Sequence, residues 1–388
     1  MSYPMQFTRA APAMTVDLST GTLDLFVDGD ADLEAFCDVA ARANPRRGFL
    51  IVSRVLGRHL PARPGAMRAA MDGLAARVGS DLPGPVVFLG MAETATALGQ
   101  GCFAAWQARH PGADAVYLQS SRQRVAGAEV AARFEEGHSH ATSHLVQIAD
   151  PAIRARVAEA RALVIVDDEC STGATFVAAA TALLGAMPRL ERIETCCITD
   201  WSDGSYLDAM PRPAAARAIV SGRMRWSAAT AAPPAELAAG SNAPGAAPDA
   251  GMKSRTGLLH PERARRAAVA AAPGERVLVL GEGEHSYEAL LVAEEIERQG
   301  GIAAVQCITR SPALIGGAMA SKSTFRDSYD SGAPCFLYNM LAHAPDRVVI
   351  VTERPADQRA EAAAALADLG SSVPVDVVAC LYAGGEGE

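Results

Sequence analysis

Short apolar runs that alternate with helix-like segments constrain the fold of this chain more than any other feature of its sequence. In the first half the runs are rich in Val, Ile and Leu and end in turns: RGFLIVSRVL, PVVFLGM, AVYLQ, LVIVDD and RIETCCITD. Segments such as AETATALGQGCFAAWQAR, PAIRARVAEA and TFVAAATALLGAM separate them. Strands that are apolar throughout are buried on both faces by the helices that connect them. The pattern therefore predicts an α/β fold with a doubly wound parallel sheet.

A tract rich in Ala, Pro, Gly and Ser interrupts this pattern at residues 227–256. It has no periodicity and little apolar surface to bury, so we expect a linker. The alternation then resumes with ERVLVLGEGEHSY, ALLVAEEIERQGG, AAVQCITRSP and DRVVIVTE. We therefore expect an N-terminal arm at residues 1–30, a first domain at 31–226, the linker, and a smaller Rossmann-like α/β domain at 257–388.

The charge balance and the cysteines of the chain limit its function. A net charge of −9 over 388 residues does not favour nonspecific binding to nucleic acid or to anionic membranes. The eight cysteines form no CxxC pair and no regular framework, which fits a reduced cytoplasmic setting. No stretch resembles a signal peptide or approaches the ~18 apolar residues of a membrane span. We expect a cytoplasmic protein with neither nucleic acid nor membrane as its partner.

The stretch LVIVDDECSTGATF, residues 163–176, carries the strongest chemical signal. Asp167 and Asp168 end an apolar run, and small residues lead from them into a helix. The backbone N–H groups of such a loop converge on an anion, and the helix N-terminus adds its dipole. The two acids repel a phosphate but accept hydrogen bonds from the hydroxyls of a sugar that carries it. A ribose 5-phosphate group satisfies both halves; the alternative is a strand end with an ordinary helix cap.

Three further stretches carry polar groups that suit a phosphorylated ligand. In FLGMAETATALGQG, Gly90 follows a strand and Thr94 precedes a helix, although Glu93 also suits a dipole role alone. Arg122 and Arg124 lie in a long polar insertion at residues 120–145, which we expect to be a mobile hood. The third stretch, NPRRGFLIVSRVLGRHLPARP, contains Arg46, Arg47, Arg54, Arg58 and His59.

The polar insertion also contains His138, His140 and His144. These histidines lack cysteine neighbours and a fixed helical spacing, so a zinc site is not expected. Arginines of both basic stretches are equally compatible with solvated surface positions.

The stretch VDDECSTGAT resembles the phosphoribosyl-pyrophosphate (PRPP) loop of type I phosphoribosyltransferases. The resemblance implies that Asp167 and Asp168 contact the ribose hydroxyls and that PRPP carries Mg²⁺ to a place near them. It implies no metal site made of protein ligands alone. The implied phosphate loop is Glu169, Cys170, Ser171, Thr172, Gly173, Ala174 and Thr175, and the implied pyrophosphate loop is Gly90, Met91, Ala92, Glu93 and Thr94.

Four stretches together resemble a narrower branch of that family, found with tellurite-resistance-associated gene clusters: NPRRGFLIVSRVLGRHLP, GMAETATALGQG, HSHATSH and VDDECSTGAT. The motif CITRSPA contains Thr309, Arg310, Ser311 and Pro312, for which the companion TRSP domain of this branch is named. The resemblance implies a type I phosphoribosyltransferase domain followed by a TRSP domain. It further implies a base-like acceptor, a stress-linked nucleoside-like product and, as is usual in type I enzymes, a homodimer.

Residues of the second domain predict a ligand site of their own. Polar groups follow the strands VLVL and AVQCI, at the edge where such sheets bind ligands. An arginine between hydroxyls suits a phosphate, and the carboxylates suit sugar hydroxyls or the arginine. GEGE lacks a full GxGxxG pattern, so a dinucleotide is not expected. The alternative is an internal ion pair between Arg310 and Glu282. The candidates are Glu282, Glu284, Thr309, Arg310, Ser311, Asp327 and Asn339.

The predicted reaction is transfer of a phosphoribosyl group from PRPP with loss of pyrophosphate. Asp167 and Asp168 would hold the ribose, Mg²⁺ with Arg122 or Arg124 would neutralise the leaving group, and the hood would exclude water. Three alternatives stay open at this point. They are hydrolysis or phosphorolysis of a nucleotide, a PRPP-binding regulator without turnover, and a thiol hydrolase that uses Cys170.

Overall fold

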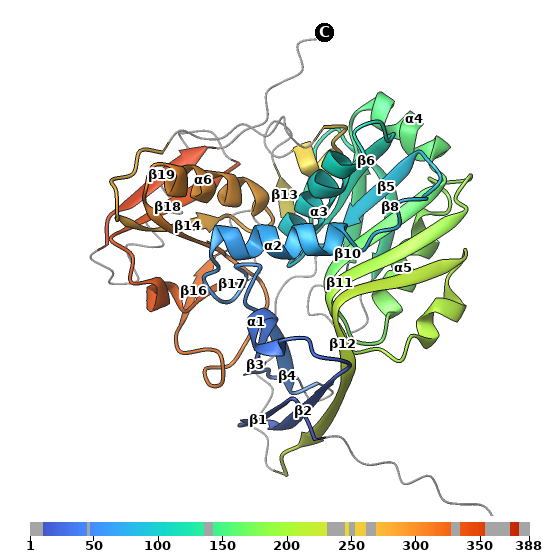
Figure 1. Cartoon of the computed structure of the whole chain (residues 1–388). Coiled ribbons are helices and arrows are strands. Elements are labelled where there is room, and N and C mark those ends of the chain that lie inside the picture. The colour runs from blue at the N-terminus through green and yellow to red at the C-terminus, as the bar shows by residue number, and fades with distance from the viewer. Residues whose placement is uncertain are drawn as a thin grey trace, which may run out of the picture.

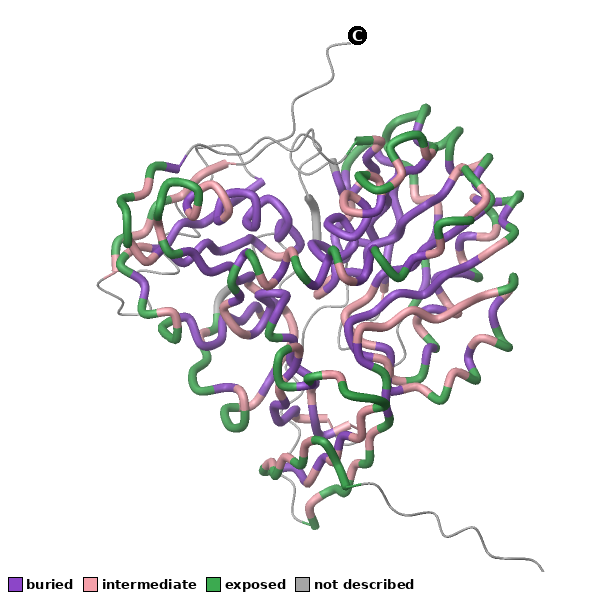
Figure 2. The backbone as a smooth tube through the Cα atoms, in the orientation of Figure 1, coloured by how far each residue is buried: buried purple, intermediate pink, exposed green. Residues whose placement is uncertain are grey.

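The computed structural model describes residues 11–44, 47–135, 143–230, 245–247, 253–260, 269–326, 334–353 and 373–379. Two sheets dominate it (Figure 1). We call residues 11–230, which build the larger sheet, the first unit, and residues 269–379, which build the smaller sheet, the second unit. The strands at the centre of both sheets are mostly buried, whereas exposed residues lie mainly on the surrounding loops (Figure 2).

The larger sheet has nine strands in the order β1-β2-β12-β11-β10-β5-β6-β9-β8. Its central strands are parallel to one another, as the continuous apolar runs predict. Antiparallel strands extend it at both edges. The central strands are β5 (Val86–Gly90), β6 (Ala115–Ser121), β10 (Ala162–Cys170), β11 (Arg192–Asp200) and β12 (Ala214–Ala228).

Helices cover both faces of this sheet. Helices α2 (Pro64–Ala75) and α3 (Thr96–Arg109) pack together on one face, and α5 (Ala174–Leu183) follows β10 on the other. Helix α4 (Pro151–Glu159) contacts β6 and β9. The arrangement is the doubly wound α/β fold expected from the sequence.

The N-terminal strands lie in two different places. Strands β1 (Met14–Leu18) and β2 (Gly21–Val27) extend the large sheet, whereas β3 (Cys37–Ala41) and β4 (Phe49–Ser53) form a separate antiparallel pair after the short helix α1 (Leu33–Phe36).

The apolar run RGFLIVSRVL therefore does not lie in the large sheet. It is apolar because both faces of the pair are covered. Val39 packs with the N-terminal hairpin, and Val52 packs with Tyr338 of the second unit.

The stretch expected as a long polar loop is largely strand. Strands β7 (Gln123–Val125), β8 (Glu129–Glu135) and β9 (Ser143–Ile148) occupy it, and residues 136–142, with His138 and His140, lie outside the described residues. In β8 the buried residues Ala132 and Phe134 alternate with exposed ones, which is the period of a strand with one covered face. The polar composition of the stretch hides this alternation.

The second unit is a smaller parallel sheet in the order β15-β14-β18-β19. Its strands are β14 (Arg276–Gly281), β15 (Ile302–Cys307), β18 (Arg347–Thr352) and β19 (Val375–Ala379), with a separate pair β16 (Lys322–Arg326) and β17 (Pro334–Tyr338). The stretch DQRAEAAAALADLG, residues 357–370, also predicts a helix from its sequence, but it lies outside the described residues. Helix α6 (Tyr287–Arg298) packs against α2 and α3 of the first unit, so one large apolar cluster extends through both units.

Parts of the expected linker are packed against the first unit. Strand β13 (Gly245–Ala247) pairs with β7, and the 3₁₀ helix η2 (Lys253–Thr256) contacts β6 and β9. Leu258 exchanges backbone hydrogen bonds of 2.9 Å with Tyr117. In the part of the chain that the structure describes, no helix is long and apolar enough to cross a membrane.

A close backbone approach between α3 and β5 fixes the strand end on which the candidate site is built. A Cβ atom on Gly99 would lie 2.5 Å from Gly90 Cα, a distance that only a backbone shift can relieve. We expect Gly99→Ala to lower the free energy of unfolding by about 1–3 kcal/mol. Gly112→Ala is the matched control, because nothing lies within 4 Å of its Cβ position. Urea unfolding of both variants checks this, and equal losses would contradict it.

Candidate active site

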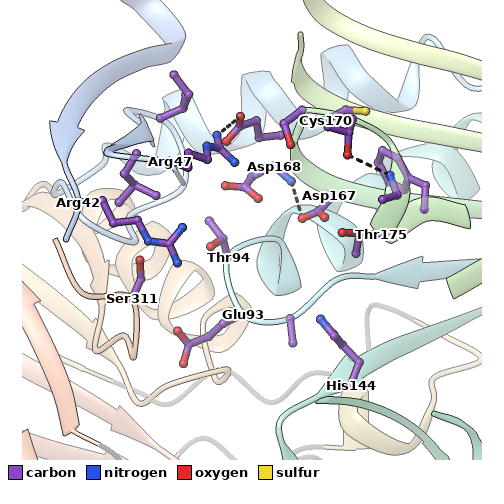
Figure 3. A pocket seen from close by; sticks show the side chains of 18 of the residues that line it. Arg42, Arg47, Glu93, Thr94, His144, Asp167, Asp168, Cys170, Thr175 and Ser311 are labelled. Carbon is purple, nitrogen blue, oxygen red and sulfur yellow. Dashed lines mark hydrogen bonds and ion pairs between the residues drawn. The ribbon is translucent and has the colours of Figure 1, made fainter. Parts of the chain in front are cut away.

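A pocket lies where the carboxyl ends of β5 and β10 meet the second unit (Figure 3). It unites stretches that are far apart in the sequence. The candidate residues among those that line it are Ala92, Glu93, Thr94, Arg122, residues 167–175, Arg310 and Ser311. Gly90, Met91, Arg124, Glu282, Glu284, Thr309 and Asn339 are not among the lining residues, and Asp327 lies outside the described part of the chain.

The loop after β10 joins the strand directly to helix α5. Asp167 and Asp168 are half-buried at the strand end, and the Asp168 N–H donates to Asp167 Oδ1 at 2.9 Å. Gly173 has a φ of +75°, and a Cβ there would lie 2.0 Å from the Tyr206 ring, so both conformation and space require glycine. Helix α5 begins directly after it at Ala174. The first N–H groups of a helix have no acceptor within the helix, and here the Ala174 N–H donates to Thr172 Oγ1 over a long distance of 3.4 Å.

The side chain of Glu169 points to the β3–β4 segment and not to the loop it belongs to. Its Oε1 accepts a 2.5 Å hydrogen bond from the Arg47 guanidinium, which also lies 4.8 Å from the Phe49 ring centre. Burial raises the pKa of Glu169, while Arg47 acts in the opposite direction. This ion pair holds the β3–β4 segment against the pocket.

The loop after β5 is held from both units. The Ala92 N–H donates to Ser120 Oγ at 2.8 Å, and Ser120 Oγ lies 3.0 Å from His144 Nδ1. Glu93 Oε2 accepts from Thr309 Oγ1 at 2.8 Å and from the Arg310 N–H at 3.0 Å. The residues of the TRSP motif therefore fix the one carboxylate of this loop.

The two arginines of the polar stretch are used differently. Arg122 lines the pocket, is 7% exposed and donates from its guanidinium to the Ser143 carbonyl at 3.4 Å. Arg124 donates to Gln147 Oε1 at 2.6 Å and to the Val125 carbonyl at 2.8 Å. Only the first is in a position to meet a ligand in this pocket.

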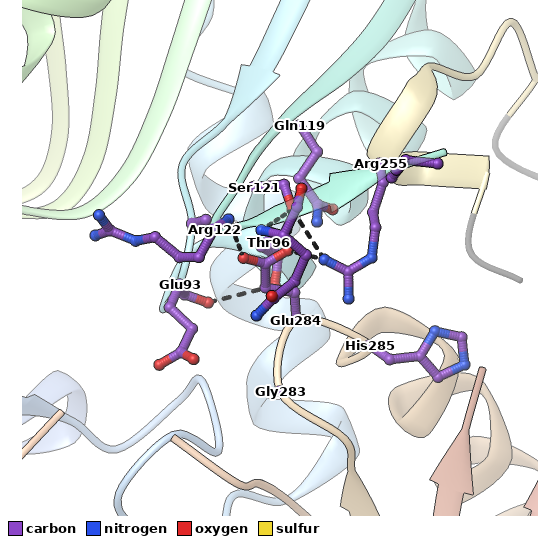
Figure 4. A network of polar contacts seen from close by, with 12 residues as sticks. Glu93, Thr96, Gln119, Ser121, Arg122, Arg255, Gly283, Glu284 and His285 are labelled. Carbon is purple, nitrogen blue, oxygen red and sulfur yellow. Dashed lines mark hydrogen bonds and ion pairs between the residues drawn. The ribbon is translucent and has the colours of Figure 1, made fainter. Parts of the chain in front are cut away.

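A buried cluster of charges joins the two units beside the pocket (Figure 4). Arg255, from η2, is fully buried and pairs with Glu284 and with Glu353, the latter at 2.7 Å. Glu284 also accepts from Ser121 Oγ at 2.7 Å and from the Arg122 N–H at 2.6 Å. The carboxyl ends of the two sheets therefore face each other. Glu284 connects them through its contacts with Ser121, Arg122 and Arg255.

The other second-unit candidates make contacts within or between the units. Glu282 accepts from Thr352 Oγ1 at 2.5 Å. Asn339 accepts from the Ala320 N–H at 2.7 Å and donates to the Ala318 carbonyl at 2.9 Å. Arg310 and Ser311 instead line the pocket shared with the first unit.

Sequence reasoning missed several residues of this site. Arg42, Leu50 and Ile51 line the pocket. Arg255 holds the two units together beside it, through its pairs with Glu284 and Glu353. Arg255 lies near the end of a tract of small residues, shortly before Leu258 and Leu259. This return of larger side chains was its only signal in the sequence.

Two titratable side chains at the pocket are held neutral. Burial, followed by the nearby Arg58 and Arg42, lowers the pKa of His59 to about 3. Burial raises the pKa of the Cys170 thiol well above its usual value. A protonated, buried thiol is a poor nucleophile, which gives no support to the thiol hydrolase alternative.

The family of the chain follows from its sequence. Residues 36–221 match the model of a family described as phosphoribosyl transferase. These residues thus form a domain of that family. Residues 252–369 match the TRSP domain, described as lying C-terminal to that family's domain. The chain therefore has a domain of the phosphoribosyl transferase family followed by a TRSP domain, as the motifs suggested.

Solved phosphoribosyltransferases share low sequence identity with this chain. The adenine phosphoribosyltransferase of Rhodothermus marinus is 16% identical, with 48% of this chain and 94% of that chain covered and a TM-score of 0.32. That of Trypanosoma brucei, solved with AMP, pyrophosphate and ribose-5-phosphate, is 12% identical, with 53% and 86% covered and a TM-score of 0.34. The orotate phosphoribosyltransferase of Aeropyrum pernix is 19% identical, with 47% and 85% covered and a TM-score of 0.29. No curated protein matches the chain.

Removal of the Arg255 side chain should strongly destabilise the protein. Arg255→Ala leaves the buried carboxylates of Glu284 and Glu353 without their arginine, and such a loss costs about 3–5 kcal/mol. The control is Arg161→Ala, which breaks an exposed pair with Glu191 and should change stability little. Urea unfolding measures both. A loss for Arg255→Ala no larger than that of the control would contradict the role of the cluster.

The depressed pKa of His59 predicts a pH dependence of stability. An exposed histidine titrates near pH ~6.5, so below that pH the unfolded chain binds a proton that folded His59, with a pKa of about 3, does not. Stability therefore falls as the pH falls, by roughly 2 kcal/mol between pH ~6.5 and ~5. His59→Gln lacks this contribution. Urea unfolding at the two pH values should show a smaller loss for the variant, and equal losses would refute the prediction.

Proposed function

We propose that this chain transfers the 5-phosphoribosyl group of PRPP to a base-like acceptor and releases pyrophosphate. One observation carries the proposal. The half-buried acid pair Asp167 and Asp168, the loop of residues 171–175 and the loop of residues 92–94 line the same pocket. A sugar that has free hydroxyls between two phosphorylated positions suits an acid pair that lies between two loops.

Each part of PRPP has a counterpart in the pocket under this proposal. The 5-phosphate binds the N–H groups of residues 171–175 at the start of α5. The ribose hydroxyls donate to Asp167 and Asp168. The pyrophosphate lies by residues 92–94, with Arg122 as its cationic side chain.

The chemical step makes a bond between the anomeric carbon and a nitrogen of the acceptor and breaks the bond to the pyrophosphate oxygen. Its transition state has positive charge at the sugar, so the chain contributes orientation and charge placement instead of a covalent intermediate. The carboxylates of Asp167 and Asp168 lie on the sugar side of the pocket and favour that charge. The Arg122 guanidinium favours the departing pyrophosphate.

The pocket suits Mg²⁺ that enters with the substrate. Among the described residues, no group of three or more His, Cys, Asp or Glu is arranged to hold a metal ion. Asp167 and Asp168 are two carboxylates at the ligand edge, and Mg²⁺ typically takes one or two carboxylates together with substrate phosphates and water. When bound, the ion would offset the charge of the pyrophosphate.

The biological setting is proposed on the motif resemblance. It is the synthesis of a nucleoside-like metabolite linked to tellurite and stress resistance. Seven cysteines of the described residues are free and buried, which supports a reducing cytoplasmic setting. A homodimer is proposed on the resemblance to type I enzymes alone.

Loss of the acid pair should strongly weaken PRPP binding. We expect Asp167→Asn/Asp168→Asn to weaken Mg-PRPP binding by on the order of 100-fold, since a hydrogen bond to a charged group contributes about 1.5–3 kcal/mol. Calorimetry measures the binding, and pyrophosphate release is followed with a pool of candidate bases. The matched control is Asp28→Asn/Asp30→Asn, which removes the same charge from an exposed loop.

Each outcome of this experiment has a distinct meaning. Binding and release by the wild type, both lost in the acid-pair variant, support the transferase. Wild-type binding without release from any base favours a regulator, and release of a free base from a nucleotide favours hydrolysis or phosphorolysis. No binding of Mg-PRPP to the wild type would refute the proposed site.

A further inference from the structure

Part of the pocket lies beyond the groups that PRPP would use. This part, which we call the second wall, consists of Arg42, Leu50, Ile51, His59, Arg310 and Pro312. Four of these residues come from the first unit around β4, and two come from the TRSP motif of the second unit. Figure 3 shows Arg42 and Ser311 together on one side of the pocket, with Asp167 and Thr175 on another. The acceptor must enter against this wall if PRPP fills the rest.

His59 carries a polar atom suited to a ligand. The side chain lines the pocket and is 4% exposed, and among the described residues its Nε2 has no hydrogen-bond partner. Its ring packs on Tyr338 of the second unit, with 5.6 Å between the ring centres. A buried polar atom without a partner costs free energy, and a ligand in the pocket would remove that cost.

The second wall contains two arginines. Arg42 is 8% exposed and Arg310 is half-buried, and both line the pocket. The depressed pKa of His59 reports the same field, because after burial its causes are Arg58 and Arg42. A guanidinium donates hydrogen bonds and accepts none, while Leu50, Ile51 and Pro312 offer apolar contact to a ring. Such a wall matches a flat ring with an anionic substituent better than a neutral base, which needs acceptors as well as donors.

We propose that the acceptor is a heterocycle with a carboxylate or phosphate group, which Arg42 and Arg310 bind while His59 hydrogen-bonds the same group. This inference rests on the proposed phosphoribosyl transfer and names the class of its second substrate. It makes Arg310 a specificity-determining residue that the second unit supplies to the site of the first. The pyrophosphate of PRPP would instead be bound by Arg122 and residues 92–94.

The test measures binding of ligand pairs that differ by one anionic group. The probes are orotate and uracil, nicotinate and nicotinamide, and phenyl phosphate and phenol, titrated by calorimetry into enzyme with Mg²⁺ and ribose 5-phosphate. The carboxylate and phosphate pairs separate the two sources of charge. We expect the anionic member of at least one pair to bind about tenfold more tightly, as a charge-assisted hydrogen bond allows.

Variants assign that preference to the second wall. Arg310→Gln should abolish it, Arg310→Lys should keep part of it, and Arg42→Gln gives an independent test from the first unit. In Arg310→Gln the affinity for Mg-PRPP should stay within about threefold of the wild type, well below the effect of a lost ionic contact. Arg298→Gln is the control, since it removes an exposed charge from the same unit. Thermal melts establish that each variant is folded.

Three results would overturn the inference. The first is equal or tighter binding of the neutral member in every pair. The second is the absence of binding by any anionic probe at millimolar concentration. The third is an equal loss of Mg-PRPP affinity and probe affinity in Arg310→Gln, which would assign the arginine to the pyrophosphate. Failure of the proposed function is distinct, because it appears as wild-type enzyme that does not bind Mg-PRPP at all.

Discussion

The buried pairing of Arg255 with Glu284 and Glu353 is the interaction on which the arrangement of this protein depends. Three charges leave water in this cluster, and their mutual attraction offsets the desolvation cost only while all three are present. Glu284 extends the cluster to Ser121 and to the Arg122 backbone at the end of β6. The cluster thus fixes one sheet edge against the other, and the apolar contact of α6 with α2 and α3 supports it.

The facing edges explain why residues of the TRSP motif line a pocket together with residues of the first unit. In open α/β sheets, ligands bind beyond the carboxyl ends of the strands, and here two such edges share one space. Thr309 and the Arg310 N–H hold the Glu93 carboxylate, while the Arg310 side chain lines the pocket. The second unit therefore shapes the loop after β5 as well as the wall opposite the acid pair.

Patterns of neighbouring residues in the sequence predicted the structural features that depend on neighbouring residues alone. The apolar runs predicted β5, β10 and β14, and a pair of acids before small residues marked the loop that the structure places at a pocket. The rest depends on contacts between distant residues. The run in β4 is apolar because two partners cover it, Arg255 is buried only because Glu284 and Glu353 meet it, and Arg42 and His59 reach the pocket through the fold. No periodicity reports such contacts.

The position of Arg255 in the segment between the units makes that connection part of the interface. One chain supplies the two halves in a fixed one-to-one ratio and at a high effective concentration, so they need not find each other by diffusion. A shorter gene that ended after β12 would encode the acid pair and the loop of residues 171–175 without residues 310–312 and without the Arg255 cluster. The two halves of the pocket are therefore inherited together.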